Sequence, residues 1–169
     1  MAEPPRRVVT GHAPDGRSVI VEDGPVPSSR TVANGATFHE IWSTGAAPVS
    51  VAAVEPDPTR GPTRVPPPPG GSVIRRVDFA PGARSPMHRT ESVDYGIVLE
   101  GEIHLVLDGE TAALRPGDVV VQRGTDHAWE NRGGEPAQML FILIDGTFAD
   151  ELRELLGDEV ELMEEPPAP

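Results

Sequence analysis

Apolar residues recur with a period of two in short runs through the second half of the chain, and turn-forming pairs separate the runs. The separators include Pro81-Gly82, Asp108-Gly109 and Pro116-Gly117, which are typical of tight connections between antiparallel strands. This pattern predicts strands at residues 72–80, 94–100, 102–107, 111–114, 118–122, 128–131 and 138–144. Short strands at such spacing indicate a β-sandwich or a β-barrel, so we expect an all-β fold.

The first 70 residues show a weaker β pattern. Short β-prone runs are predicted at residues 7–10, 18–21, 37–42 and 49–54. The proline-rich segment 65–71 is expected to be an extended connector, because proline lacks the donor that a central strand requires. We therefore expect residues 1–70 to form an N-terminal β arm and residues 71–146 to form the barrel.

One short helix is predicted in the last part of the chain, residues 147–169. Thr147 and Asp150 have the spacing of a capping box, and the apolar residues that follow fall on one helical face. These residues are Phe148, Leu152, Leu155 and Leu156. The acidic, proline-ended segment after the helix is expected to fray.

Composition excludes several classes of function. The 169 residues suit one domain, and the absence of cysteine excludes disulfides and thiolate metal ligands. A net charge of −13 argues against binding nucleic acid or an anionic membrane. We see neither a membrane-spanning apolar run nor a secretory signal, and so we expect a cytoplasmic protein. Arginine without any lysine suggests a high-GC bacterial source.

Polar side chains gather on one face of a strand-like segment. His88, Thr90, Ser92 and Asp94 share a face by the period of two, whereas Tyr95 points to the other side. His127, Trp129 and Asn131 share a face in the same way. A polar inner face in a small barrel is typical of a ligand or metal pocket.

Two motifs in this region resemble those of the cupins, a family of small jelly-roll β-barrels. The first has the cupin spacing with two substitutions, Thr90 for histidine and Asp94 for glutamate; in the second, Gln122 replaces proline and one spacing is a residue shorter. The motifs read Gly82-x5-His88-x-Thr90-x3-Asp94-x6-Gly101 and Gly117-x4-Gln122-Arg123-Gly124-x2-His127-x3-Asn131. The resemblance covers about residues 72–144 and implies a jelly-roll barrel.

The resemblance also implies a divalent metal ion, of Fe, Zn, Mn or Ni, held by His88, Asp94 and His127. Two histidines and one carboxylate form the open arrangement of non-haem Fe(II) sites. Such a site implies an enzyme acting on a small carbonyl, carboxylate or aromatic metabolite by decarboxylation, dehydration, isomerisation or oxygenation. The surrounding substrate pocket is expected to contain Thr90, Ser92, Gln122, Trp129 and Asn131.

Two alternatives follow from the substituted motifs. In a metal-free pocket, His88 and His127 would act as catalytic residues by bonding the substrate or moving a proton. In a non-catalytic barrel, the same pocket would only bind a small molecule. A sugar epimerase is poorly supported, because Tyr95 is predicted to point away from the pocket.

A barrel of about 75 residues buries a modest core, and the β-prone runs of the arm are not expected to be stable alone. If the arm pairs with the sheet edge of another copy, its β-prone runs gain hydrogen-bond partners and the exposed sheet edges are covered. We therefore predict a homodimer in which the N-terminal arm contributes to the interface.

Overall fold

The structure, a computed structural model, describes residues 3–157 and 160–166. Within these residues the chain forms antiparallel β-sheets, a single turn of 3-10 helix (η1, Pro58–Arg60) and a short α-helix (α1, Asp150–Leu156). The strands are β1 (Arg6–His12), β2 (Ser18–Pro25), β3 (Ser28–Thr31), β4 (Ala36–Thr44), β5 (Ser72–Phe79), β6 (Ser92–Glu100), β7 (Ile103–Val106), β8 (Thr111–Leu114), β9 (Val119–Arg123), β10 (Ala128–Glu130) and β11 (Ala137–Asp145).

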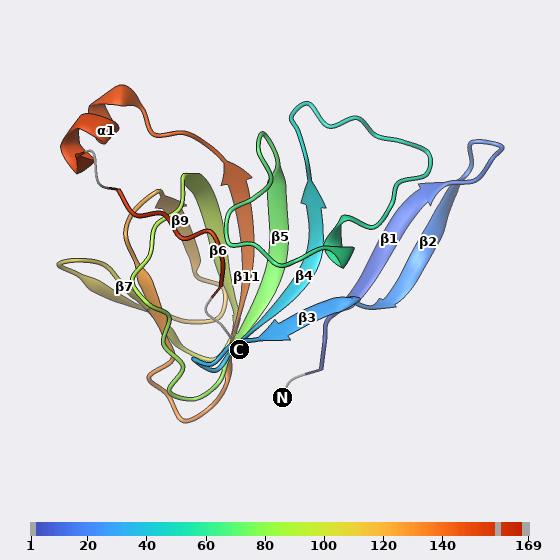
Figure 1. Cartoon of the computed structure of the whole chain (residues 1–169). Coiled ribbons are helices and arrows are strands. Elements are labelled where there is room, and N and C mark those ends of the chain that lie inside the picture. Colours follow the sequence, from blue (N-terminus) through green and yellow to red (C-terminus); the bar gives the residue numbers. More distant parts are fainter. Residues whose placement is uncertain (1–2, 158–159, 167–169) are drawn as a thin grey trace.

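Two of the sheets form the barrel (Figure 1). The larger has the strand order β3-β4-β5-β11-β6-β9, and the smaller has the order β10-β7-β8. Their inner faces share one apolar core, in which Val98 and Met139 of the large sheet are buried with Ile103 and Trp129 of the small one. Each strand predicted after residue 71 is present, and the all-β jelly-roll fold is confirmed.

Part of the N-terminal region belongs to the barrel sheet itself. Strand β4 pairs with β5 along its length, and β3, which the sequence pattern did not indicate, pairs with β4. The apolar run 49–54 forms no strand, and Val51 and Val54 remain 81% and 85% exposed. Alternation alone could not exclude a strand there, because a strand also needs a neighbouring edge with which to pair.

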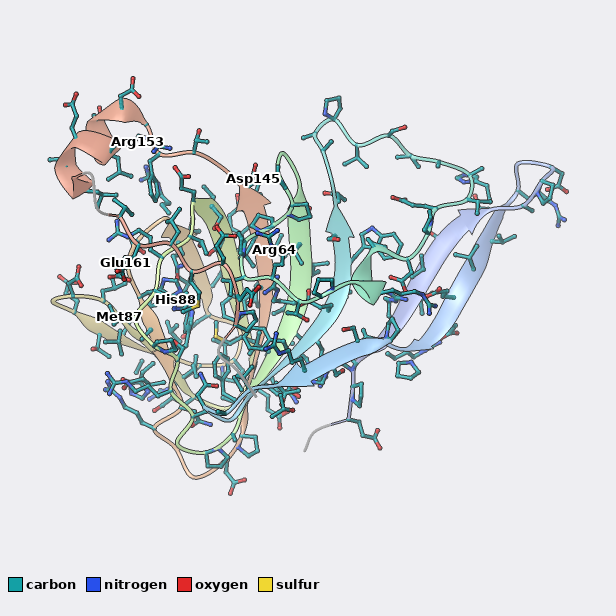
Figure 2. All side chains as sticks on the ribbon, in the orientation of Figure 1. Arg64, Met87, His88, Asp145, Arg153 and Glu161 are labelled. Carbon is teal, nitrogen blue, oxygen red and sulfur yellow. The ribbon has the colours of Figure 1, made fainter. Side chains whose placement is uncertain are left out.

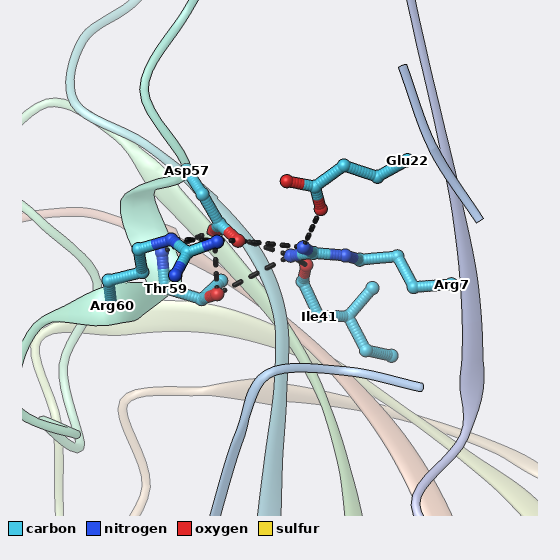
Figure 3. A network of polar contacts seen from close by, with 6 residues as sticks. All are labelled: Arg7, Glu22, Ile41, Asp57, Thr59 and Arg60. Carbon is cyan, nitrogen blue, oxygen red and sulfur yellow. Dashed lines mark hydrogen bonds and ion pairs between the residues drawn. The ribbon is translucent and has the colours of Figure 1, made fainter. Parts of the chain in front are cut away.

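Strands β1 and β2 form a hairpin that extends away from the barrel (Figure 1). Its base is fixed by the buried guanidinium of Arg7, which forms ion pairs with Glu22 and with Asp57, at 2.7 Å for the latter (Figure 3). The same guanidinium donates to the Ile41 carbonyl and lies 5.6 Å from the Trp42 ring centroid. This network ties the hairpin to β4 and to the turn at η1.

Helix α1 begins at Asp150 after Ala149, which provides no side-chain cap, so the predicted capping box at Thr147 is wrong. No helical residue is buried, and Leu155 is 82% exposed. The helix instead redirects the chain, and residues 160–166 then cross the barrel opening (Figure 1). No helix among the described residues is long and apolar enough to cross a membrane.

Hydrogen bonds hold this C-terminal segment in place. The Met163 amide donates to the Arg89 carbonyl at 2.9 Å, and the Glu164 carbonyl accepts from the Val65 amide at 3.0 Å. The side chains of Arg64 and Glu164 form an ion pair at 2.6 Å (Arg64 is labelled in Figure 2). The proline-rich connector and the C-terminal segment therefore lie side by side over the barrel.

Candidate active site in the barrel

The sheet register places an unusual row of residues across the inner face of the barrel. Glu40 on β4 lies beside Arg75 on β5, which lies beside Phe141 on β11, and Phe141 lies beside Gly96 on β6. A Cβ atom at Gly96 would stand 3.1 Å from the Phe141 ring and 3.2 Å from the end of Met139. Glycine at position 96 leaves room for the Phe141 ring to pack over β6. The row also places one charged pair, Glu40 and Arg75, among apolar neighbours.

A cavity of about 80 Å³ lies inside the barrel and is bounded by a polar cluster and an apolar wall. Polar residues in its lining come from β5, β6 and β9, from the turn between β3 and β4, and from the segments leading into β6 and β10. The lining residues include Arg75, His88, Thr90, Asp94, Gln122 and His127, with Phe38, Val77, Phe79, Trp129, Phe141 and Leu143 forming apolar wall. Such a cavity, largely apolar with a few convergent polar groups, is typical of a small-molecule site.

His88 and His127 face each other across an isolated antiparallel bridge, with their ring centroids 4.1 Å apart. The Nδ1 atom of His88 donates to the Pro86 carbonyl at 3.0 Å, and that of His127 donates to the Thr125 carbonyl at 3.0 Å. We assign the proton of each ring to Nδ1 on this basis, which leaves Nε2 of each as an acceptor. The position of His88 on the barrel is shown in Figure 2.

Gln122 links the two halves of the polar cluster. Its amide nitrogen lies 3.3 Å from Oδ2 of Asp94 and 3.0 Å from Nε2 of His127. The same nitrogen is 2.9 Å from Nδ1 of His127, but that atom already donates to Thr125, so we assign the hydrogen bond to Nε2. One NH2 group thus serves two acceptors, while Oδ1 of Asp94 is buried without a partner among the described residues.

Burial determines the charge states of the cluster. It raises the pKa of Asp94 to about 6, and Ser92 and Arg75 oppose the rise. It lowers the pKa of His127 to about 3, with a further contribution from His88, and it lowers the pKa of His88 as well. Both imidazoles are therefore neutral at pH 7, and Asp94 titrates close to neutrality.

The predicted metal ligands do not fit a metal ion as they are placed. Among residues 3–157 and 160–166, no group of three His, Cys, Asp or Glu side chains is positioned to hold one. The Gln122 amide fills the space between Asp94 and His127 and gives each a hydrogen bond. His127 could not bind a metal ion through Nε2 and also keep its hydrogen bond to Gln122, so the donor set as placed suits an organic ligand better.

The other residues predicted for the pocket divide into two groups. Thr90, Gln122 and Trp129 line the cavity, whereas Ser92 and Asn131 do not. Ser92 is buried beside the cavity and shares a hydrogen bond of 2.8 Å with Thr90. The Asn131 amide bonds the Phe79 and Glu135 carbonyls, so its side chain is used to hold a turn. Tyr95 points to the outer face, as predicted.

Sequence reasoning missed the charged pair and the C-terminal wall of the site. Arg75 and Glu40 are buried, and their Nε and Oε1 atoms lie 3.6 Å apart. Met163 and Pro166 line the cavity from the C-terminal segment. The alternation within Ser72–Phe79 places Arg75 on the same face as Val77 and Phe79, and this was the available signal for an arginine inside the barrel.

A second cavity of about 520 Å³, called the outer cavity, lies between the barrel residues Glu40, Val73 and Arg75 on one side and the proline-rich connector and C-terminal segment on the other. It is bounded by Glu40, Asp145 and Glu164, and by prolines 66–69. Arg75, Thr90 and Met163 border both cavities. These three residues therefore stand at the boundary between the inner and the outer cavity.

Comparison with known proteins agrees with this architecture. The family model described as "Cupin domain" matches residues 75–143. The chain is 42% identical over 160 residues to phomopsin biosynthesis cluster protein C' of Diaporthe leptostromiformis, covering 90% of this chain and 85% of that protein. It is 42% identical over 149 residues to the cupin-domain-containing oxidoreductase fogC of Aspergillus ruber, covering 82% and 71% respectively.

A solved structure of a cupin 2 conserved barrel domain protein from Salinispora arenicola has the same fold, with a TM-score of 0.51 and 23% identity. That match covers 74% of this chain and 89% of the other. The chain belongs to the cupin family. The two relatives compared by sequence are fungal, and the predicted bacterial source stays a prediction.

Proposed function

We propose that this cupin is an enzyme that moves a proton on a small carbonyl or carboxylate compound bound inside the barrel. The observation that carries the proposal is the arrangement around Gln122. Its amide holds Asp94 and His127 together, while Oδ1 of Asp94 is buried without a partner among the described residues. Asp94 and His88 both border the cavity. Buried polar groups without partners are uncommon, and a substrate would supply the missing ones.

His88 is suited to accept the proton. Its Nδ1–H is held by the Pro86 carbonyl, so the basic Nε2 atom remains available, and burial keeps the ring neutral at pH 7. Asp94 is suited to the role of donor, because a carboxyl group with a pKa of about 6 can donate a proton or a hydrogen bond to a substrate oxygen. The apolar wall excludes water, which strengthens both interactions.

A second candidate function is a metal-dependent oxidoreductase. It is favoured by the name of the fogC relative, and cupins commonly bind a divalent metal ion. For such a role, Gln122 would have to release Nε2 of His127 so that this atom could join His88 and Asp94. Purification of the protein with one Fe, Zn, Mn or Ni per chain would support this candidate.

The test is exchange of the hydrogens next to a carbonyl in deuterated water, followed by proton NMR. The probes are pyruvate, 2-oxobutyrate and 2-butanone, and the protein is used both as purified and after chelation, with its metal content measured. We expect exchange that survives chelation, is lost in His88→Asn and persists in Tyr95→Phe, whose side chain lies on the outer face. Exchange that requires metal would favour the second candidate, and absence of exchange with every probe would contradict the proposed function.

A further inference from the structure

Arg75 is a buried cation whose donors are only partly satisfied by the described residues. Its side chain is only 4% exposed, and a guanidinium carries five N–H donors. Of these, Nη2 donates to the Arg64 carbonyl at 2.8 Å, and Nε is buried without a hydrogen-bond partner among the described residues. Burying a charge is costly unless it is paired and hydrogen-bonded, so this arrangement needs an explanation.

Glu40 only partly accounts for Arg75. The Glu40 Oε1 and Arg75 Nε atoms are 3.6 Å apart, within reach of an ion pair but beyond a hydrogen bond, and Oε1 is also without a hydrogen-bond partner. A structural arginine–carboxylate pair usually forms two parallel hydrogen bonds at about 2.7–2.9 Å. The pair is therefore held close by the strand register, and neither partner is satisfied by the other.

Arg75 lies where a ligand in the barrel can reach these donors. The side chain borders the inner cavity together with His88, Asp94 and Trp129, and it also borders the outer cavity. Its guanidinium carbon lies 6.0 Å from the Phe38 ring centroid, within the range of a cation–π contact. A molecule in the barrel would thus meet a positive, planar group at the boundary between the two cavities.

We propose that Arg75 binds the carboxylate of the substrate, whose apolar body lies in the inner cavity against Trp129 and Phe141. The proposal rests on the proposed function and names the substrate class: small organic acids, with an aromatic or branched body suited to the wall. The guanidinium fork matches a carboxylate in two hydrogen bonds, and Glu40 is the group that the ligand displaces.

The neighbouring Arg76 provides a matched control. It lies on the opposite face of β5, where it donates to the Glu3 carbonyl and to Asp78. It borders neither cavity. Arg75→Lys and Arg76→Lys therefore make the same chemical change on the two faces of one strand.

The experiment compares benzoate with benzamide, its neutral isostere, by NMR titration that follows the indole signal of Trp129. We expect wild-type protein and Arg76→Lys to bind benzoate more tightly than benzamide. Arg75→Lys should lose roughly ten- to a hundredfold in benzoate affinity, the range for a hydrogen bond to a charged group, with little change for benzamide.

A second variant separates carboxylate binding from a purely structural ion pair. If Glu40 competes with the ligand, Glu40→Gln should bind benzoate more tightly than wild type; a structural pair predicts no gain. The double variant Arg75→Met/Glu40→Gln avoids leaving either charge alone in the core and should lose the preference for benzoate.

The outcomes for the two proposals can be told apart. If wild type shifts the Trp129 signal but binds the two probes equally, the role of Arg75 is overturned and the proposed proton transfer is unaffected. Loss of the exchange reaction alone would contradict the proposed function and leave this binding result standing.

Discussion

Asp94 on β6 and Gln122 on β9 are directly paired in the sheet register, and their side chains meet on the inner face at 3.3 Å. The pairing explains how a residue that replaces the proline of the second cupin motif becomes part of the site. In the strand that now continues to Arg123, position 122 points inward, and a long amide there reaches both Asp94 and His127.

Replacing Gln122 by leucine should destabilise the fold and disable the site. The substitution removes the donor that serves Asp94 and His127, and each buried acceptor left without a partner costs about 1–3 kcal/mol. With two acceptors affected, we expect a loss of about 2–6 kcal/mol in urea unfolding and loss of the carbonyl exchange reaction. Gln138→Leu, on the half-buried outer side of β11, is the control. A Gln122→Leu protein as stable and as active as wild type would show that the amide bridge has no role.

The raised pKa of Asp94 predicts a specific pH dependence of stability. Because the folded chain holds this proton more tightly than the unfolded chain, Asp94 favours folding below about pH 4, and this advantage disappears as the pH rises to about 6. The shift from 3.8 to about 6 corresponds to about 3 kcal/mol.

The check is the free energy of unfolding of wild type and Asp94→Asn between pH 4 and pH 7. We expect the difference between them to change by up to that amount, in favour of the variant as the pH rises. The comparison isolates Asp94 because His88 and His127 are present in both proteins. A difference that stays constant with pH would mean that Asp94 has an ordinary pKa.

Met163 should limit the size of the ligand. Its side chain borders both cavities, so Met163→Ala should join them and admit a larger aromatic acid. We expect the affinity for 2-naphthoate to increase relative to benzoate, with a modest loss of stability of roughly 1–2 kcal/mol, because Met163 is only half-buried. Met87→Ala makes the same change at an exposed site outside both cavities. An unchanged ratio of the two affinities would exclude Met163 as a determinant of size.

We predict that the chain forms a homodimer through the outer face of the large sheet. Tyr95, Val119 and Val121 share that face, and the two valines are 59% and 58% exposed. The projecting hairpin β1–β2 also exposes Val8 and Ile20, and a lone two-stranded hairpin is marginally stable in water. A second copy of the chain could cover both surfaces.

Light scattering should give twice the mass of the chain for wild type and a single mass for Val121→Arg. The control is Val51→Arg, which places the same charge on an exposed loop outside the sheet. A wild-type protein that remains monomeric across the concentration range would contradict the dimer.

The barrel and half of the site could be predicted from the sequence because both depend on local pattern. The period of two placed His88, Thr90 and Asp94 on one face, and Tyr95 on the other, before any pairing was known. The metal-ligand prediction is not supported by the arrangement, since it assumed that motif spacing alone brings His88, Asp94 and His127 together. The side chain of Gln122, at a position where the motif has proline, decides what fills the space between Asp94 and His127.

The remaining parts of the site come from segments whose placement is not local. Glu40 reaches Arg75 only because β4 joins the sheet beside β5, and this pairing depends on a register between residues 35 positions apart. Met163 reaches the cavity because a helix with no buried face turns the chain back over the barrel. Neither event leaves a periodic signal in the sequence.

The position of β4 has a consequence for how the protein can be divided. The cupin model begins at residue 75, but Phe38 of the inner wall and the counter-charge of Arg75 lie upstream of it. In a fragment trimmed to residues 75–143, β5 would become an unpaired edge strand. Arg75 would lose Glu40 and would be exposed to solvent. Substitutions in the first 45 residues, far from either cupin motif, can therefore change ligand preference. A chimaeric protein that exchanges only the segment with the two motifs would receive an incomplete pocket.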